Sequence, residues 1–382
     1  MALTDETSET TDTTSPTSPT SPTSPTSPTS PASATGPAPA VGSHAGDTAS
    51  GIAAAPGPVA AGPLPHLALA RPSLDRVADE RRRPDVLAAL LADPATRVAE
   101  LRGDRLEVTS EGADGDGGLA LVLRAPEPAD PARLALHLGR GPDGTAYVGV
   151  VGDEPDDEGE DAADGGAGVR RWLALRQAGE TLGPLDAGIF TTVLALANWH
   201  ATHAHCPRCG SVTTPTQAGW VRRCERDGTE HYPRTDPAVI MSVVDPDDRL
   251  LIGRGAHWPE GRFSVLAGFV EPGESFEAAV AREVAEEVGI AVHDVRYLGN
   301  QPWPFPSSAM IGFAARTTET ELTLDPLEMA EARWVTRAEY RAALRDGSVR
   351  TPSGISIAKR IIEHWLGETV ESAAAVPDGR RH

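Results

Sequence analysis

The sequence has few cysteines. Only 3 occur in 382 residues, and all of them lie between residues 206 and 224. So few cysteines in one short window do not make the disulfide framework of a secreted domain, and they indicate a reducing compartment. The start, Met1 to Glu6, also lacks the basic and apolar regions of a secretory signal. We therefore predict a cytoplasmic protein.

The sequence also lacks a long apolar run that is free of proline. The stretch 52–70 is mostly apolar, but it contains four prolines, Pro56, Pro58, Pro63 and Pro65. Because proline disrupts a helix that must satisfy its own backbone in lipid, this composition argues against a membrane span. We expect no membrane partner.

The sequence also lacks a basic stripe. This absence argues against tight, sequence-independent binding of nucleic acid. The net charge is -21. Residues 1–70 contribute five acids and residues 152–168 eight, with no Lys or Arg in either, so -13 of the -21 lies there and -8 elsewhere. Solvated acidic loops explain this distribution better than a docking tail for a basic protein.

Composition divides the chain into five segments. Residues 15–31 repeat Ser-Pro-Thr, and residues 1–70 as a whole are too poor in apolar side chains to offset their ordering entropy, so we predict a disordered tail. Residues 71–200 are predicted to form a mixed α+β domain with an acidic insertion at 152–168. A zinc-ribbon-like module (201–235), a catalytic domain (236–370) and a flexible C-terminus (371–382) follow.

The apolar periodicity predicts an α/β fold. Helices are expected at Val86–Ala92, Asp186–Trp199, Phe276–Val288 and Ile355–Leu366. Strands are expected at Leu119–Arg124, Leu134–Leu138, Tyr147–Val151, Ala238–Val244, Arg249–Gly253, Phe263–Phe269, Val295–Leu298, Met310–Arg316 and Ala332–Val335. After residue 236 these elements favour a mixed sheet sandwiched by helices.

The strongest chemical signal is GFVEPGESFEAAVAREVAEEVGI, residues 268–290. In a helix, Glu283, Glu286 and Glu287 stand at positions i, i+3 and i+4, so three carboxylates crowd one face. Crowding of like charges is costly unless a divalent cation neutralises it, and an all-oxygen site suits Mg²⁺ or Mn²⁺. Arg282 can orient the cluster, and Gly268 leaves room for metal or phosphate near the backbone.

This stretch resembles the Nudix box, and every fixed position of the box matches. The resemblance implies an α/β/α sandwich that splits a nucleoside diphosphate linked to another group. It also implies a set of metal ligands: the carboxylates of Glu283, Glu286, Glu287 and Glu328 and the backbone carbonyl of Ala267. Glu331 is the alternative to Glu328. Glu287 is also a candidate for helping to activate water.

A second segment, QPWPFPSS, occupies residues 301–308. Its alternate prolines stiffen an extended backbone and present Trp303 and Phe305 as flat surfaces that suit a nicotinamide ring or a base. The alternative is a proline-rich core loop. After a Nudix box, the segment resembles the signature of the NADH pyrophosphatases, also known as NAD-capped RNA hydrolases. The residues implied to line the dinucleotide site are Gln301, Pro302, Trp303, Pro304, Phe305, Pro306, Ser307 and Ser308.

The subfamily resemblance covers about residues 185–367 and implies further contacts. Tyr232 and Phe269 would flank the nicotinamide ring, and Ala358 would contact the substrate through its backbone. A packed core tyrosine is the alternative for Tyr232. The implied reaction cuts the pyrophosphate of NAD(H) into nicotinamide mononucleotide and AMP, or removes an NAD cap from RNA. Homodimers in which both chains contribute to the site are common in the subfamily.

The cysteines form one complete metal-binding knuckle and part of a second. Cys206 and Cys209 make a Cys-x-x-Cys pair, whereas Cys224 is followed three positions later by Asp227. A glycine follows each pair in the same place, so the tight turn is retained. Zinc accepts carboxylate oxygen although it prefers thiolate. We therefore predict a structural zinc site formed by these four residues.

Alternatives remain at two levels. His231 or His205 could replace Asp227 as the fourth zinc ligand, or the turn could be free of metal, with Asp227 accepting backbone hydrogen bonds. For the whole protein, the first alternative is a Nudix hydrolase of another dinucleotide, such as ADP-ribose, FAD or diadenosine polyphosphate. The second is a zinc-ribbon adaptor with a silent Nudix domain, which the intact acidic cluster disfavours.

Overall fold

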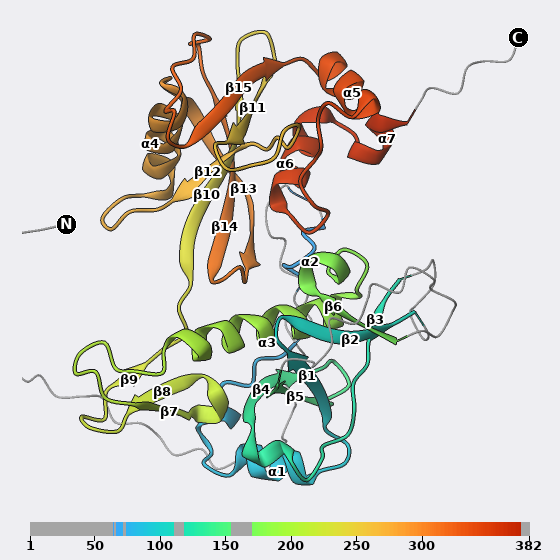
Figure 1. Cartoon of the computed structure of the whole chain (residues 1–382), viewed down its shortest axis with the longest axis vertical. Coiled ribbons are helices and arrows are strands. Elements are labelled where there is room, and N and C mark those ends of the chain that lie inside the picture. The colour runs from blue at the N-terminus through green and yellow to red at the C-terminus, as the bar shows by residue number, and fades with distance from the viewer. Residues whose placement is uncertain (1–63, 65, 72–73, 111–117, 154–169, 376–382) are drawn as a thin grey trace, which may run out of the picture. The chain divides into compact units, whose positions relative to one another are not determined.

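The computed structural model describes residues 64, 66–71, 74–110, 118–153 and 170–375 (Figure 1). Its helices are α1 (Val86–Ala92), α2 (Leu175–Ala178), α3 (Pro184–Thr202), α4 (Phe276–Val288), α5 (Arg337–Asp346), α6 (Ile357–Leu366) and α7 (Val370–Ala374), with 3₁₀ turns at Glu80–Arg82, Asp130–Ala132 and Gln217–Gly219. Its strands are β1 (Arg97–Arg102), β2 (Arg105–Thr109), β3 (Ala120–Leu121), β4 (Leu134–Arg140), β5 (Ala146–Gly152), β6 (Arg170–Ala174), β7 (Thr213–Thr216), β8 (Val221–Cys224), β9 (Glu230–His231), β10 (Asp236–Val244), β11 (Leu250–Gly255), β12 (Leu266–Phe269), β13 (His293–Trp303), β14 (Ser308–Arg316) and β15 (Met329–Val335).

The first sheet has the order β3-β2-β1-β5-β4, with β6 paired to β2. Strands β1 and β5 are parallel, and the other pairs are antiparallel. Helix α3 lies on one face, where Phe190 and Val193 join Leu101 in a buried cluster. Helix α1 covers the other face through Val86, which packs in a cluster with Val98. The segment before residue 200 is therefore a mixed α+β sheet domain, as predicted.

The second sheet has the order β13-β14-β10-β11-β15, with β12 paired to β10. Strand β10 runs parallel to β14 and antiparallel to β11 and β12, so the sheet is mixed. Side chains of β10 alternate between two buried clusters: Val239 and Met241 pack with α4, whereas Ile240 packs with α6. The predicted sandwich of a mixed sheet between helices is confirmed.

Helix α4 is held at both of its ends. The Ser275 hydroxyl oxygen accepts a hydrogen bond from the Ala278 N–H at 3.1 Å and caps the first turn. Gly289 ends the helix with a φ of 73°, in the left-handed region where glycine is favoured. Beyond it, the Asp325 N–H donates to the Glu287 carbonyl at 3.1 Å. This bond fixes the 325–329 turn against the helix C-terminus.

The third sheet, β7-β8-β9, follows α3 along the chain and carries the cysteine knuckles. Arg222 on β8 is buried and ties this sheet to α3. Its guanidinium contacts the Nδ1 atom of His200 at 2.8 Å and donates to the hydroxyl of Thr213 at 2.8 Å. The ribbon is therefore anchored to the helix that precedes it.

Two predicted strands are shorter than expected because each changes its partner. Of 119–124 only Ala120–Leu121 forms a strand, since Val122 bonds to β2 whereas Arg124 crosses to Val98 of β1. In the predicted strand 263–269, only Leu266–Phe269 forms a strand with β10. Ser264, before it, pairs instead with Gly253 of β11. Strands β1, β2 and β6 and helix α5 were not singled out from the sequence.

Two predicted segment limits need correction, and other predictions fall outside the described residues. The predicted tail ran to residue 70, but Leu64, Leu67 and Leu69 are buried in the two large cores. The flexible C-terminus was predicted from residue 371, but α7 runs to Ala374, with Ala373 buried. The predictions for residues 1–63, 154–169 and 376–382 lie outside the described part. No described helix is long and apolar enough to cross a membrane.

Candidate active site

Helix α4 brings two of its three acids to one buried place. Glu283 and Glu287 are buried, whereas the side chain of Glu286 is 57% exposed and turns toward Arg282. Glu328, in the turn before β15, joins the buried pair closely enough that its charge raises the pKa of both carboxyls. Glu331, the alternative, is engaged with Arg254 and Arg333. The structure thus assembles Glu283, Glu287 and Glu328.

Burial makes Glu287 an unusual carboxyl. Its pKa is raised to about 8, first because burial disfavours the charged form and then because Glu283 and Glu328 repel it. Burial raises the pKa of Glu283 as well, although the guanidinium of Arg282 opposes this shift. The Oε2 atom of Glu287 is buried with no hydrogen-bond partner. A buried carboxylate oxygen without a partner is the chemistry that a divalent cation satisfies.

Gly268 is required by the close approach of Glu283. A Cβ atom built at residue 268 would lie 1.8 Å from the Cδ atom of Glu283. The carboxylate therefore occupies the space that any other side chain at this position would fill. Because β12 pairs with β10 at this point, the neighbouring Ala267 is fixed beside the acidic cluster. These residues fit a hard cation held by oxygen atoms.

Arg282 positions the cluster. Its guanidinium donates to Glu274 at 2.8 and 2.9 Å, to Glu283 at 2.9 Å and to Glu286 at 2.8 Å. It also donates to the Phe269 carbonyl at 2.8 Å, which joins β12 to α4. The hydrogen bonds from Arg282, followed by one from the Glu271 N–H, lower the pKa of Glu274 to about 2. These hydrogen bonds hold β12 against the acidic face of α4.

A cavity of about 370 Å³ opens beside the acidic cluster. Predicted residues in its wall are Ala267, Glu287, Glu328, Trp303 and Ala358. It also contains residues that were not singled out from the sequence, among them Arg176, Trp258, Arg262 and Ser353. The volume is near the lower end of the range for small-molecule sites, about 300–1,000 Å³. The wall therefore places acids that suit a cation beside Arg176, which suits an anion.

The 301–308 segment is partly strand and partly turn. Gln301 is buried and donates from Nε2 to the Ile355 carbonyl at 2.8 Å, and β13 continues to Trp303. Trp303 and Phe305 meet edge to face, with ring centroids 4.9 Å apart, and pack against the core of the first sheet domain. The guanidinium of Arg176 lies 3.7 Å from the Phe305 ring centroid. The segment thus combines a packed loop with one aromatic side chain, Trp303, in the cavity wall.

Tyr232 and Phe269 do not line this cavity. They are 64% and 60% exposed, and the Tyr232 hydroxyl donates to Glu230 at 3.0 Å. The interpretation of Tyr232 as a packed core residue is therefore wrong. Their expected contact with a nicotinamide ring stays a prediction.

The cysteine cluster forms from two knuckles that repeat the same hydrogen bonds. In each, the first cysteine donates its N–H to the carbonyl five residues later, at 2.8 and 2.9 Å. The following glycine donates back to that cysteine's carbonyl at 2.8 and 3.0 Å. These glycines, Gly210 and Gly228, have φ angles of 71° and 72°. The tight turn is therefore equal in both halves, although one half carries Asp227.

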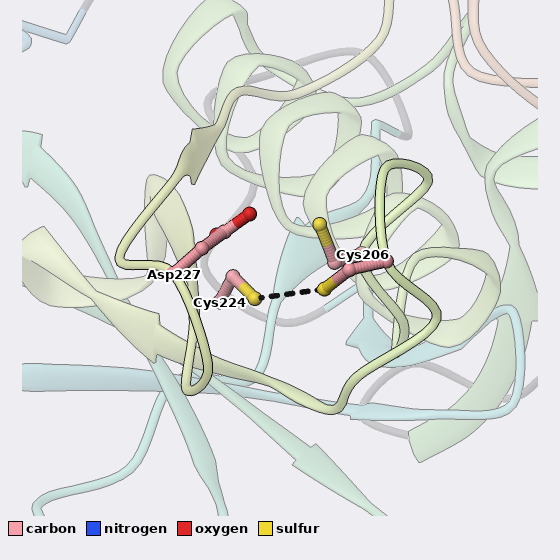
Figure 2. A group of neighbouring side chains, drawn as sticks. Cys206, Cys224 and Asp227 are labelled. Carbon is pink, nitrogen blue, oxygen red and sulfur yellow. Dashed lines mark hydrogen bonds between the residues drawn. The ribbon is translucent and has the colours of Figure 1, made fainter.

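Cys206, Cys209, Cys224 and Asp227 each offer a ligand atom, all within 4.8 Å of one another (Figure 2). The sulfur atoms of Cys209 and Cys224 are 3.6 Å apart, close to the about 3.8 Å expected for two thiolates on one tetrahedral zinc. Asp227 also accepts a hydrogen bond from the Thr229 N–H at 2.9 Å, which helps to lower its pKa to about 2. Among the described residues, neither His205 nor His231 joins this cluster.

Comparison with known proteins matches both parts of this site. Residues 234–352 match the NUDIX domain, and residues 201–232 match the NADH pyrophosphatase zinc ribbon domain. The chain therefore carries a NUDIX domain preceded by a zinc ribbon of the NADH pyrophosphatase type. The zinc ribbon match covers the knuckles, including the position at which this chain carries Asp227.

Curated relatives of this chain include the NAD-capped RNA hydrolase NudC of Mycobacterium bovis, which is 47% identical over 200 residues. That match covers 50% of this chain and 64% of the relative. The human NAD-capped RNA hydrolase NUDT12 is 40% identical over 193 residues, covering 47% of this chain and 42% of the relative. The chain thus spans less than two thirds of the length of either relative. Among solved structures, a NUDIX hydrolase from Nitrosomonas europaea matches at 22% identity with a TM-score of 0.35, covering 43% of this chain and 94% of that one.

Sequence reasoning missed the arginines of this cavity. Arg176 lies on the short helix α2 of the first sheet domain, and Arg262 lies in the loop between β11 and β12. Burial, and then the charge of Arg262, lower the pKa of Arg176. No sequence motif marks either residue, because they meet only when the first domain folds against the second.

Proposed function

We propose that this Nudix hydrolase cuts the central pyrophosphate of NAD(H) to give nicotinamide mononucleotide and AMP, and that it removes NAD caps from RNA by the same cleavage. The observation that carries the proposal is that Glu287, Glu328, Arg176 and Trp303 all line one cavity. The acids suit a cation, the arginine suits phosphate, and the indole suits a planar ring. The names of the curated relatives support the same substrate class.

Glu283, Glu287, Glu328 and the Ala267 carbonyl would hold Mg²⁺ or Mn²⁺, with Glu286 as the exposed and least constrained ligand. When bound, the cation polarises the pyrophosphate and activates water. Arg282 keeps Glu283 and Glu286 in place through its fork of hydrogen bonds. Arg176, steadied by the rings of Trp303 and Phe305, faces the cavity as a fixed cation for the substrate's phosphate.

The reaction needs one water molecule. Its oxygen forms a new bond to one phosphorus while the bond from that phosphorus to the bridging oxygen breaks, and the bridging oxygen stays with the other phosphate. Glu287 is the candidate for helping to activate the water, because it lines the cavity and its buried Oε2 atom has no hydrogen-bond partner. Both products are then monophosphates, and an RNA that carried the cap keeps a 5′-monophosphate.

We further propose that Cys206, Cys209, Cys224 and Asp227 hold a structural zinc ion. The low pKa of Asp227 keeps it ionised, as a carboxylate ligand must be. The zinc supplies no step of the reaction. Its effect would be to hold the ribbon that connects α3 to β10.

Mass spectrometry of the products from NADH and from NAD-capped RNA, with Mg²⁺ or Mn²⁺, tests the hydrolase function. Wild type should release AMP from NADH, and Glu287→Gln should lose about 10²–10⁴-fold in kcat. A wild-type protein that forms no AMP would overturn the assignment. A fully active Glu287→Gln variant would instead overturn the proposed metal site.

A substrate panel tests the NAD(H) assignment against other dinucleotides. NADH, NAD⁺, ADP-ribose, FAD and diadenosine polyphosphate should be compared by kcat/KM under one set of metal conditions. We expect NADH to lead the panel. If ADP-ribose were far ahead, the chain would be a Nudix hydrolase of another dinucleotide.

A further inference from the structure

A tryptophan and an arginine form a pair in the wall of the active-site cavity. Trp258 and Arg262 belong to the loop between β11 and β12, and both line the cavity that contains Glu287 and Glu328. The guanidinium carbon of Arg262 lies 4.9 Å from the centroid of the Trp258 ring. Both side chains are exposed, Trp258 by 37%. The pair therefore faces solvent as well as the cavity, which places it at the rim.

The loop that carries this pair is firmly held. The Ala256 N–H donates to the Glu328 carbonyl at 2.8 Å, which joins the start of the loop to the acidic cluster. At its other end, the Gly261 carbonyl accepts from the Arg350 N–H at 2.7 Å. Gly255 lies so close to the indole that a Cβ there would contact it at 3.4 Å. A rigid support of this kind is what a binding surface needs, because little side-chain entropy is lost when a ligand arrives.

The charges of the cavity leave Arg262 without a counter-ion. The acids, Glu287 and Glu328, are accounted for by the proposed divalent cation, and Arg176 by a phosphate of the scissile pyrophosphate. Within the described residues Arg262 takes part in no ion pair. Its guanidinium instead stacks on the Trp258 ring. A guanidinium stacked on an indole keeps its in-plane N–H groups free to bind an anion. The counter-ion that Arg262 lacks would therefore be an anion of a ligand that reaches the rim of the cavity.

The size of the cavity indicates where that anion comes from. At about 370 Å³ the cavity lies near the lower end of the usual range of about 300–1,000 Å³ for small-molecule sites, so a dinucleotide would leave little space unfilled. A group attached to its ribose would have to leave across the rim. An aromatic face next to a cation is also the arrangement that binds a single-stranded nucleotide, through base stacking and phosphate pairing.

We propose that Trp258 and Arg262 form a rim subsite for a further phosphate on the ribose of the dinucleotide, beyond the scissile pyrophosphate. The inference rests on the proposed hydrolysis of NAD(H). Such a phosphate has two sources: the phosphodiester that continues an NAD-capped RNA, and the 2′-phosphate of NADPH. The subsite makes the enzyme discriminate between these substrates and NADH, which has no such group.

The test measures kcat/KM for NADH, NADPH and a short NAD-capped RNA with wild type, Arg262→Gln, Arg262→Lys and Trp258→Leu. Arg262→Gln should leave NADH turnover within about twofold and lower kcat/KM at least fivefold for NADPH, for the RNA, or for both. Arg262→Lys keeps the charge, so it should retain part of the activity on NADPH and the RNA that Arg262→Gln loses. Trp258→Leu should reduce activity on the RNA more than on NADPH, because only the RNA continues into a further base beyond the dinucleotide.

Salt dependence and a matched charge variant complete the test. Loss of one phosphate contact should lower the slope of log kcat/KM for the RNA against log salt by about 1 with Arg262→Gln. Arg82→Gln removes the same charge from a side chain that is 74% exposed and outside this cavity, and it should change neither value. Equal loss on all three substrates, or loss on none, would overturn the rim subsite. A wild type that is inactive on NADH would instead overturn the proposed function.

Discussion

At the scale of single residues, the proposed catalytic role of Glu287 conflicts with stability. It is buried beside Glu283 and within the field of Glu328, and its Oε2 atom has no hydrogen-bond partner. A buried, unpaired carboxylate destabilises the folded chain until a cation neutralises it. The helix geometry required by the proposed metal site therefore lowers the stability of the protein when the metal is absent.

The pH dependence of stability should reveal this conflict. The folded pKa of Glu287, about 8, exceeds the ordinary value of 4.5, so its contribution to stability is full below about pH 4.5 and is lost as pH rises through about 8. In a chelating buffer at pH 8, Glu287→Gln should be more stable than wild type by roughly 2–4 kcal/mol. Denaturant unfolding from pH 5 to 9 measures this difference. A variant no more stable than wild type at pH 8 would contradict the assignment, and adding Mg²⁺ should stabilise wild type alone.

Gly268 supports a second prediction about one residue. Alanine at this position would place its Cβ 1.8 Å from the Cδ atom of Glu283, so the carboxylate must move. We expect Gly268→Ala to weaken Mn²⁺ binding at least tenfold and to reduce NADH turnover at least a hundredfold, while the chain stays folded. Titration with Mn²⁺ followed by electron paramagnetic resonance measures the binding. Gly183→Ala, where an added Cβ meets nothing within 4 Å, is the control.

At the scale of elements, helix α4 was predictable and its partners were not. Its range, Phe276–Val288, follows from apolar periodicity, a capping serine and a terminal glycine, all of which are local signals. Glu328 was placed from the family pattern, but its position beside α4 depends on the 325–329 turn bonding to the helix end. Contacts of this kind join segments far apart in the chain, and local sequence patterns do not encode them.

The ribbon offers a prediction at this scale. Wild type should hold one zinc per chain, and Asp227→Cys should bind it more tightly because thiolate is the softer ligand. Asp227→Ala should lose zinc and lower the melting temperature of the ribbon-containing protein. Elemental analysis after dialysis against a mild chelator measures the metal content. Zinc absent from wild type but stoichiometric in Asp227→Cys would mean that the aspartate marks a lapsed site.

At the scale of the whole molecule, the 301–308 segment joins the two large sheets. The Asn198 amide on α3 donates to the carbonyls of Pro304 at 3.0 Å and Pro306 at 3.4 Å. Lys359 on α6 is buried and pairs with Glu180, which follows α2, at 3.0 Å. The first domain thus contacts the 301–308 segment and also supplies Arg176 to the cavity.

Asn198 allows the effect of this junction on activity to be tested. Asn198→Ala removes two hydrogen bonds to the loop and should cost about 1 kcal/mol of stability. Because the loop carries Trp303 but no proposed metal ligand, KM for NADH should rise severalfold while Mn²⁺ affinity stays unchanged. Steady-state kinetics and metal titration measure the two effects. Asn300→Ala, which alters an exposed amide on β13, is the control, and equal effects of both variants would contradict the role of the junction.

The predicted homodimer is also tested at this scale. Light scattering coupled to gel filtration should give twice the mass of the 40.0 kDa chain. Phe269 and Tyr232 are exposed on the single chain, so a site completed by a second copy would explain how they reach the substrate. A monomer with full NADH turnover would remove that explanation and leave both residues outside the site.

The sequence by itself determined the features that depend on neighbours along the chain. These are the acidic face of α4, the two glycine turns of the ribbon, the apolar run that forms β10, and the resemblance to the Nudix family. Only the tertiary structure decided which acids are buried together, that Trp303 reaches the cavity while Tyr232 does not, and that Arg176 and Arg262 share it. The physical reason is that burial, desolvation and charge pairing depend on distance in space, which folding sets between residues far apart in the chain, such as Arg176 and Glu328, which are 152 positions apart.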